Sequence, residues 1–230
     1  MQPYIFPYLG YFQLVNHVDS FVFFDDVNFI KKGWIHRNQL LQGENPIKFT
    51  VTLHKASQNK RINEIHLSDY SGWKIDFIKK VEHCYKKAPN YNSVYSLILS
   101  ILDKKEYLTI AELAIQSVTD ITSFMGISTS FVSSNGLDYD KGADNGQQKI
   151  ISICKTLGAT SYTNPYNGRD MYDVESFEKA SLELSFLQMQ EIKYEQFKKA
   201  TFTPSLSVID VLMFNSREDI QLLLSDYQLK

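Results

Sequence analysis

The sequence predicts an α/β fold with a mixed or mainly parallel sheet, helices on its faces, a Rossmann-like start and a helical insertion. Short apolar segments bounded by turn residues alternate with segments of helical periodicity through most of the 230 residues. The region from about 70 to 126 differs, because its apolar residues recur only at helical spacing. We therefore expect a single domain, 1–230, with a helical lobe at about 70–126.

The first elements are expected in the order loop, helix, strand. Two prolines disfavour helix over residues 1–8. Residues 10–18 carry apolar side chains at helical spacing, and residues 21–24 form an apolar run typical of a buried strand. Asp25 and Asp26 would then lie at the carboxyl end of that strand, where open α/β sheets bind ligands.

The rest of the chain continues this pattern. Strands are expected at 34–41, 47–53, 127–132, just before Tyr162 and, as the last strand, at 182–189, with a further short strand over Ile62, Ile65 and Leu67. Helices are expected in three segments between 72 and 127, and at 147–157, 171–180, 207–214 and 216–227. The polar loops 54–61 and 133–146 separate them, and the first of these is expected to cover the site.

Composition excludes several classes of protein. The 24 basic and 26 acidic residues give a net charge of −2, so nothing favours nucleic acid as a partner. The basic pairs at 79–80, 86–87 and 198–199 are expected to be solvated. Two cysteines far apart in sequence predict neither a disulfide framework nor a zinc site. No apolar run reaches the roughly 18 residues that span a bilayer, and a cytoplasmic protein is expected.

Residues 2–38 combine the features of a ligand site. They hold ten of the 31 aromatic residues (2 Trp, 14 Tyr and 15 Phe in the whole chain), together with acids and bases. Sites for polar organic molecules pair aromatic walls with a few fixed polar groups. The catalytic candidates are Asp25, Asp26 and Tyr11, and the substrate-binding candidates are Gln2, Tyr4, Tyr8, Lys32, Trp34, Arg37, Asn38, Lys149 and Asn164. No metal ligands are assigned.

Each candidate has a structural alternative. A carboxylate at the strand end can act as a general base, or it can bond the amides of a turn. Lys32 and Arg37 can bind phosphate or face solvent. Tyrosine rings can stack on a sugar or base, or pack in the core. The pattern Ser207-x-x-Asp210 favours a helix cap over a functional role for Asp210.

Several motifs together resemble the WbqC-like family. They are Gln-Pro-Tyr at 2–4, Pro-Tyr-x-Gly-Tyr-Phe at 7–12, Asp25-Asp26-Val27, Trp34, Arg37-Asn38, and later Tyr194, Gln196, Leu206-Ser207 and Ile209-Asp210. This family occurs in bacterial gene clusters for O-antigen, lipopolysaccharide and related surface glycans. The resemblance implies an acyl or aminoacyl transferase, with glycine as one such group, acting on an amino sugar.

The resemblance also implies the ligands. The acceptor would be a nucleotide-linked amino sugar, and the donor an activated acyl or aminoacyl group, such as one on an acyl carrier; no cofactor is assigned with certainty. Members of the family usually have a short apolar strand ahead of Gln-Pro. The resemblance therefore implies that this strand is missing or shortened here.

Two other functions remain open at this point. Pro7-Tyr-Leu-Gly-Tyr11 resembles the Pro-His-x-Gly-His turn of nucleotidylyltransferases, with tyrosine at both histidine positions. That comparison favours a nucleotide-dependent ligase or nucleotidyltransferase-like enzyme, with Mg²⁺ at the Asp pair. The second alternative is a non-catalytic protein that binds sugar within a glycan-assembly complex. The sequence leaves the oligomeric state open.

Overall fold

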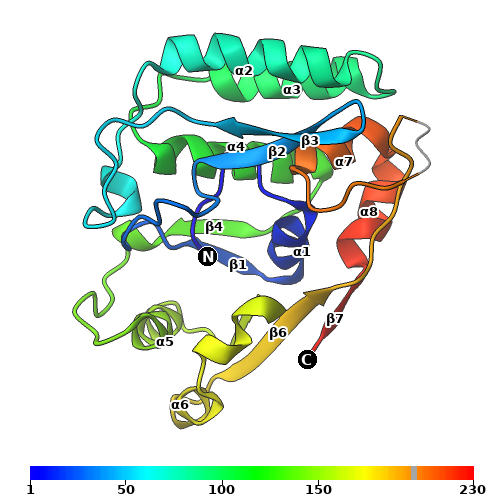
Figure 1. The fold of residues 1–230 in the computed structure, drawn as a ribbon. Helices are drawn as coiled ribbons and strands as arrows, with labels where there is room; N and C mark the ends of the chain where they lie inside the picture. Colours follow the sequence, from blue (N-terminus) through cyan, green and yellow to red (C-terminus); the bar gives the residue numbers. More distant parts are fainter. Residues whose placement is uncertain (198–200) are drawn as a thin grey trace.

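A computed structural model describes residues 1–197 and 201–230 and confirms the α/β class (Figure 1). The predicted solvated pair Lys198 and Lys199 lies outside these residues. The strands of the described chain form three small sheets, ordered β1-β4, β2-β3 and β5-β6-β7. A single sheet, as the sequence predicts, is therefore not formed.

The parallel strands, which the sequence predicts to form one sheet, instead belong to two separate sheets. In one, β1 (Ser20–Phe23) pairs in parallel with β4 (Ser130–Ser133). In the other, β5 (Ser161–Pro165) pairs in parallel with β6 (Glu183–Met189), which pairs antiparallel with β7 (Tyr227–Leu229). The third sheet is the antiparallel hairpin of β2 (Arg37–Gln42) and β3 (Asn45–Thr50).

The helices agree closely with the apolar periodicity of the sequence. The α-helices are α1 (Leu9–His17), α2 (Tyr70–Tyr85), α3 (Tyr91–Asp103), α4 (Ile110–Met125), α5 (Gly146–Thr156), α6 (Val174–Lys179), α7 (Val208–Phe214) and α8 (Arg217–Ser225). Short 3₁₀ helices are η1 (Ile62–Glu64), η2 (Ser134–Gly136) and η3 (Tyr166–Met171). Thr109 caps α4, as the sequence predicts, by accepting a hydrogen bond from the Glu112 N–H.

Two sequence predictions are wrong. The segment with Ile62, Ile65 and Leu67 forms η1 and isolated bridges instead of a strand, since Ile62 and Ile65 both turn into the core from one tight turn. The chain also does not end in a helix that reaches 227: α8 stops at Ser225, and β7 follows it. β6 is therefore not the last strand.

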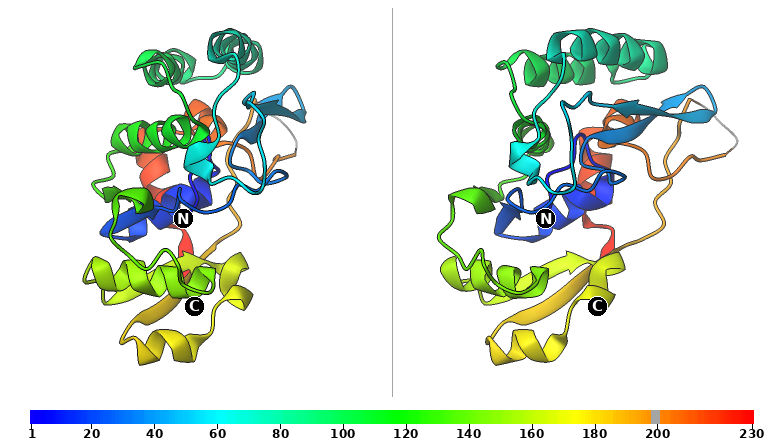
Figure 2. Two further views of the ribbon diagram at one scale, coloured as in Figure 1. Left: turned by 90° about the vertical axis from the view of Figure 1, so that its left-hand side faces the viewer. Right: turned by 60° about the vertical axis from the view of Figure 1, so that its left-hand side comes forward.

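The aromatic residues of the first elements belong largely to the core. Phe6 stacks on Phe77 with ring centroids 5.4 Å apart, and Trp73 also stacks on Phe77, at 5.1 Å. These rings join α2 to the N-terminal loop. α2 and α3 form the layer at the top of Figure 1, with the β2–β3 hairpin and α4 beneath them. A second apolar cluster (Ile151, Cys154, Phe177 and Leu182) joins α5, α6 and β6 at the lower end (Figure 2).

The backbone of Met1 pairs with the free edge of β1. Its amino group donates to the Val22 carbonyl at 2.6 Å, and its carbonyl accepts from the Phe24 N–H at 2.8 Å. This is the bonding pattern of a parallel bridge. Burial lowers the pKa of the Met1 amino group from 8.0 to about 5. No helix in the described part of the chain is long and apolar enough to cross a membrane.

Candidate functional site

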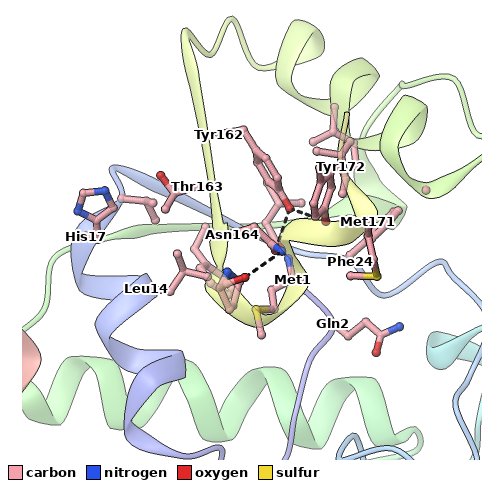
Figure 3. Close-up of a pocket in the computed structure, with 18 of the residues that line it drawn as sticks. Met1, Gln2, Leu14, His17, Phe24, Tyr162, Thr163, Asn164, Met171 and Tyr172 are labelled. Carbon is pink, nitrogen blue, oxygen red and sulfur yellow. Dashed lines mark hydrogen bonds between the residues drawn. The ribbon is translucent and has the colours of Figure 1, made fainter. Parts of the chain in front are cut away.

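A cavity of about 1840 Å³ lies between β1 and β5. Figure 3 shows part of its lining, with Leu14 and His17 from α1 and Tyr162, Asn164 and Tyr172 from the opposite wall. Pockets for one small molecule commonly measure roughly 300–1,000 Å³. This cavity is therefore larger than such a ligand needs.

The cavity divides into two parts along the strands. We call the part between the edges of β1 and β5 the inner groove; it is lined mainly by Leu14, Val18, residues 20–22, Ile153, Cys154, Leu157 and residues 159–163. We call the part beyond the carboxyl ends of these strands the mouth; it is lined mainly by Gln2, Tyr4, Tyr8, Trp34, Asn38, Gln147, Asn164, Asn167, Gly168 and residues 170–173. The mouth is where an α/β sheet binds ligands.

Two helices begin at the mouth. Tyr8 precedes α1 and lines the mouth, while Asn145, Gly146 and Gln147 line it at the start of α5. Asn145 caps α5, whereas Tyr8 gives α1 no side-chain cap within the described chain. The first N–H groups of a helix attract anions. Both helix starts can therefore attract negative charge into the mouth.

Tyr8 lies over the start of α1 because residue 10 is glycine. An ideal Cβ at Gly10 would be 2.5 Å from a ring carbon of Tyr8. Burial raises the pKa values of Tyr4 and Tyr8 above 10, so both phenols are neutral near pH 7. They offer the mouth ring faces and neutral hydroxyl groups.

Asn164 lies on the opposite wall at the end of β5. Its Oδ1 accepts from the Tyr162 hydroxyl at 3.2 Å, and that hydroxyl is 3.3 Å from the hydroxyl of Tyr172. Figure 3 shows these groups together. Gly168 makes room for this arrangement, since an ideal Cβ there would be 2.4 Å from the Asn164 Nδ2. Tyr162, Tyr172 and Gly168 are not among the residues that the sequence predicts for the site, although the Asn-Pro-Tyr-Asn-Gly turn lies beside them.

The basic candidates do not line the cavity. Arg37 donates to the backbone carbonyls of Gly33 and Lys32, and its guanidinium lies 5.7 Å from the centroid of the Trp34 ring. Arg37 therefore holds the turn that presents Trp34 to the mouth. Lys32 is exposed on the same turn, and Lys149 lies on α5 outside the lining.

Asn38 lines the mouth, but its amide is already bonded. Its Nδ2 donates to the Phe6 carbonyl at 2.7 Å, and its Oδ1 accepts from the Gln39 N–H at 2.8 Å. These bonds fix the N-terminal loop to β2. Gln2, by contrast, lines the mouth with a half-buried side chain (Figure 3).

Asp25 and Asp26 tie the end of β1 to the loop after β4. The Asp25 carboxylate accepts hydrogen bonds from the Ser133 hydroxyl (2.8 Å), the Ser134 hydroxyl (3.1 Å) and the Asn135 N–H (3.1 Å). Asp26 accepts from Ser134 and Tyr139 and lies 3.5 Å from the Lys141 ammonium group. Neither carboxylate lines the cavity, although Phe24, directly before them, does.

The third catalytic candidate, Tyr11, is fully buried. Its hydroxyl donates to the Gln2 carbonyl at 3.0 Å, and burial holds its pKa well above 10. This hydrogen bond holds the backbone of Gln2 in place. It can influence the mouth through that contact.

Asp210 forms a buried cluster away from the cavity. Its carboxylate accepts from the hydroxyls of Tyr85 (2.9 Å) and Tyr194 (2.6 Å) and from the Gln196 amide (2.7 Å). Ser207 caps α7, as the pattern Ser207-x-x-Asp210 predicts, since its hydroxyl accepts from the Ile209 N–H at 3.3 Å. Beyond this cap, the Asp210 carboxylate anchors the 194–196 segment to α2 and α7, which the sequence does not predict.

Comparison with known proteins identifies the family. The model of the WbqC-like protein family matches residues 2–222, nearly the whole chain. The chain belongs to the WbqC-like family. It is also similar to a Mycobacterium tuberculosis protein named "Uncharacterized protein Rv1507c", with 26% identity over 212 residues, which are 91% of this chain and 89% of that protein. No solved structure matches this chain.

The motifs that resembled the WbqC-like family fall into two groups in the fold. Gln2, Tyr4, Tyr8 and Trp34 line the mouth. Arg37, Asn38, the Asp pair and Asp210 hold neighbouring segments in place through their hydrogen bonds, and Asn38 also lines the mouth. The WbqC-like motifs therefore include residues that line the mouth and residues whose hydrogen bonds hold the surrounding segments in place.

Proposed function

We propose that this WbqC-like protein binds a nucleotide-linked amino sugar at the mouth and transfers an acyl or aminoacyl group, such as glycine, to its amine. The product would serve O-antigen or surface polysaccharide synthesis. The observation that carries this proposal is the mouth itself. Aromatic side chains, amide groups and two helix starts converge there at the carboxyl ends of β1 and β5.

The charge of the lining supports an amine-bearing ligand. Among the described residues, the lining contains Asp19, Asp170 and Asp173 but neither Lys nor Arg. The phosphates of either ligand can bind N–H groups at the helix starts, but these carboxylates repel the more highly charged triphosphate more strongly than the diphosphate of a nucleotide-linked sugar. This balance favours the amino-sugar transferase over the nucleotide-dependent ligase.

The aromatic side chains of the mouth can bind the sugar or the base of such a ligand. Trp34 is 43% exposed and offers a ring face to a sugar or base, and Tyr4 and Tyr8 add neutral hydroxyls. Asn164 and Gln2 bring amide groups that can donate and accept hydrogen bonds. In this proposal these residues bind and orient the acceptor.

Transfer requires that the amine lose a proton when it attacks the donor carbonyl, that the resulting oxyanion be stabilised, and that the bond from this carbonyl carbon to the donor's leaving group break when the intermediate collapses. The sequence predicts Asp25 and Asp26 as general bases; their carboxylates lie outside the cavity lining and bond the loop after β4, so this role stays a prediction that variants test. Loss of turnover with retained binding in both Asp25→Asn and Asp26→Asn would support this role. Unchanged turnover in both would remove it.

A thermal-shift panel tests the ligand class. The panel contains ATP, CoA thioesters, and UDP- and dTDP-linked amino sugars, each with and without Mg²⁺. A ligand at 100 times its Kd stabilises a protein by about 2.7 kcal/mol, which raises the Tm by several degrees. We expect a shift with an amino-sugar nucleotide and none with its hydroxyl counterpart. A shift with ATP and Mg²⁺ alone would instead support the ligase.

Trp34→Ala tests whether this ligand lies at the mouth. The change should remove most of the ligand-induced shift, because stacking on the ring is lost. Leu222→Ala is the matched control, since Leu222 is 73% exposed on α8 and lies outside the lining. An equal ligand shift in wild type and Trp34→Ala would place the ligand elsewhere.

A further inference from the structure

Two amide side chains on one wall of the mouth have their oxygen atoms held by the protein. Gln147 lies in the first turn of α5 and Asn164 near the end of β5, and both line the mouth. The Gln147 Oε1 accepts from the Asp173 N–H at 2.6 Å, and the Asn164 Oδ1 accepts from the Tyr162 hydroxyl at 3.2 Å. The amide nitrogens are therefore the groups left to bind a ligand.

The chemistry of the partners fixes which way each amide is turned. The backbone N–H of Asp173 can only donate, so the Gln147 atom that faces it is the oxygen. The Pro165 carbonyl can only accept, so the Asn164 atom turned toward it is Nδ2. Rotating either amide by half a turn would place like groups against each other.

Two tyrosine hydroxyls hold the Asn164 amide in this orientation (Figure 3). Tyr162 gives its single proton to the Asn164 Oδ1, so the hydroxyl of Tyr172, 3.3 Å away, donates to that of Tyr162. Burial raises the pKa of both phenols, which therefore keep their protons near pH 7. Tyr162 and Tyr172 act on a ligand through Asn164.

Both amide nitrogens can still donate. The Gln147 Nε2 has no hydrogen-bond partner within the described residues. The Asn164 Nδ2 lies 3.5 Å from the Pro165 carbonyl, beyond the usual N–H···O range of about 2.7–3.2 Å. Gly168 leaves room beside this nitrogen, since an ideal Cβ there would be 2.4 Å from it. This wall of the mouth therefore presents N–H donors and suits a ligand with oxygen acceptors.

The charge of the same wall favours neutral acceptors. Asp170 and Asp173 also line it, and their carboxylates repel phosphate oxygens. Carbonyl oxygens accept hydrogen bonds without a net charge. In a nucleotide, uracil and thymine present ring carbonyls and no exocyclic amine, whereas cytosine and adenine present an amino group that donates.

We propose that this wall is a base-binding subsite, in which Gln147 and Asn164 select uracil or thymine by donating N–H groups to the ring carbonyls. The inference rests on the proposed nucleotide-linked ligand and adds which nucleotides it carries. A cytosine amino group would face an amide N–H, and both donors would be left unpaired. The diphosphate keeps its place at the helix starts, and the amino sugar lies toward Trp34.

Calorimetric titration of the full chain with UDP, CDP and inorganic pyrophosphate tests this subsite. Wild type should bind UDP about tenfold more tightly than CDP. Gln147→Glu keeps an oxygen for the Asp173 N–H but replaces the donor by an acceptor, so the ratio of the two Kd values should fall to about one. The added charge affects both nucleotides alike. Gln148→Glu adds the same charge outside the lining and should keep the wild-type ratio.

Tyr162→Phe is a second variant, without a change of charge. It removes the hydroxyl that orients Asn164 and should also lower the ratio. Equal binding of UDP and CDP by wild type, or a wild-type ratio in both variants, overturns the subsite. So does pyrophosphate binding that weakens as much as UDP binding in Tyr162→Phe, since the wall would then hold the diphosphate. A preference for UDP without transfer to any amino sugar would refute the proposed activity and leave the subsite standing.

Discussion

At the scale of single residues, Gly168 decides where the Asn164 amide lies. Any side chain at 168 would collide with Asn164, because the ideal Cβ position is only 2.4 Å from its Nδ2. Gly168→Ala should therefore turn Asn164 away from Tyr162 and weaken ligand binding at the mouth by about tenfold, or 1.4 kcal/mol. Calorimetric titration with the ligand found in the thermal-shift panel measures this change.

The control for this prediction is Gly136→Ala. Gly136 is exposed in η2, and nothing lies within 4 Å of its ideal Cβ. Its substitution should leave ligand affinity unchanged. If Gly168→Ala and Gly136→Ala bind alike, Asn164 has no part in recognition.

Tyr85 shows how one hydroxyl can connect three elements. It donates to the Asp210 carboxylate and accepts from the Leu41 N–H at 2.9 Å, so it joins α2 to α7 and β2. Tyr85→Phe leaves two buried polar groups without this partner and should lower the free energy of unfolding by about 2–3 kcal/mol. Urea unfolding of both proteins measures the difference; a loss below 0.5 kcal/mol would show that Asp210 and Leu41 find other partners.

The sequence predicted which kinds of residue line the site better than it predicted the role of each residue. Five of the aromatic and amide candidates near the N-terminus line the mouth, since polar groups beside aromatic rings are common in ligand sites. The roles of Arg37 and Asn38 could not be predicted, because their partners are backbone groups brought close only by the fold. Tyr162 and Tyr172 were missed for the same reason, since they meet the N-terminal stretch only across the cavity.

At the scale of elements, α4 ends at a position that requires glycine. Gly126 has φ of +77°, a left-handed conformation in which its N–H bonds carbonyls of the last helical turn. Gly126→Ala should lower the free energy of unfolding by about 1–2 kcal/mol. Thermal unfolding checks this value, with Gly142→Ala as a control at a glycine without positive φ.

Helices were predicted more closely than strands. The apolar periodicity of α2, α3 and α4 spans many residues, and side chains cap the starts of α2 and α4. β7 has only three residues, and the strand to which it is hydrogen-bonded, β6, is distant from it in the sequence. A segment this short carries no periodic pattern of its own, so α8 was extended across it.

At the scale of the whole molecule, the free energy of unfolding should depend on the state of the Met1 amino group. Its pKa is 8.0 in an open chain and about 5 in the fold, so the unfolded state binds more protons between these values. Stability should therefore rise from pH 5 to pH 8 by as much as about 1.4 kcal/mol per pH unit, and this contribution is absent below pH 5, where both states are protonated.

Acetylation of the amino group isolates this effect. Other groups titrate over the same range, but only the Met1 contribution disappears when the group becomes an amide. Urea unfolding at several pH values, with and without acetylation, gives the two slopes. Equal slopes would mean that the amino group is solvated in the folded protein.

The division of the expected sheet also belongs to this scale. The sequence predicts which segments form strands, but it contains no measure of which strands become neighbours. The structure places β1 and β5 on opposite sides of one groove, so two parallel pairs replace one continuous sheet. Strand pairing is set by packing of the whole chain, which explains why the α/β class was predictable and the sheet was not.

The two tryptophans occupy contrasting surroundings, and this gives the protein two built-in optical probes. Trp34 is 43% exposed beside the mouth, whereas Trp73 is 7% exposed and stacked on Phe77. Ligand binding should change the emission of Trp34 alone, while unfolding should shift the emission of Trp73 to longer wavelength. With Trp34→Phe and Trp73→Phe variants, one fluorimeter can follow occupancy of the mouth and opening of the core as separate signals.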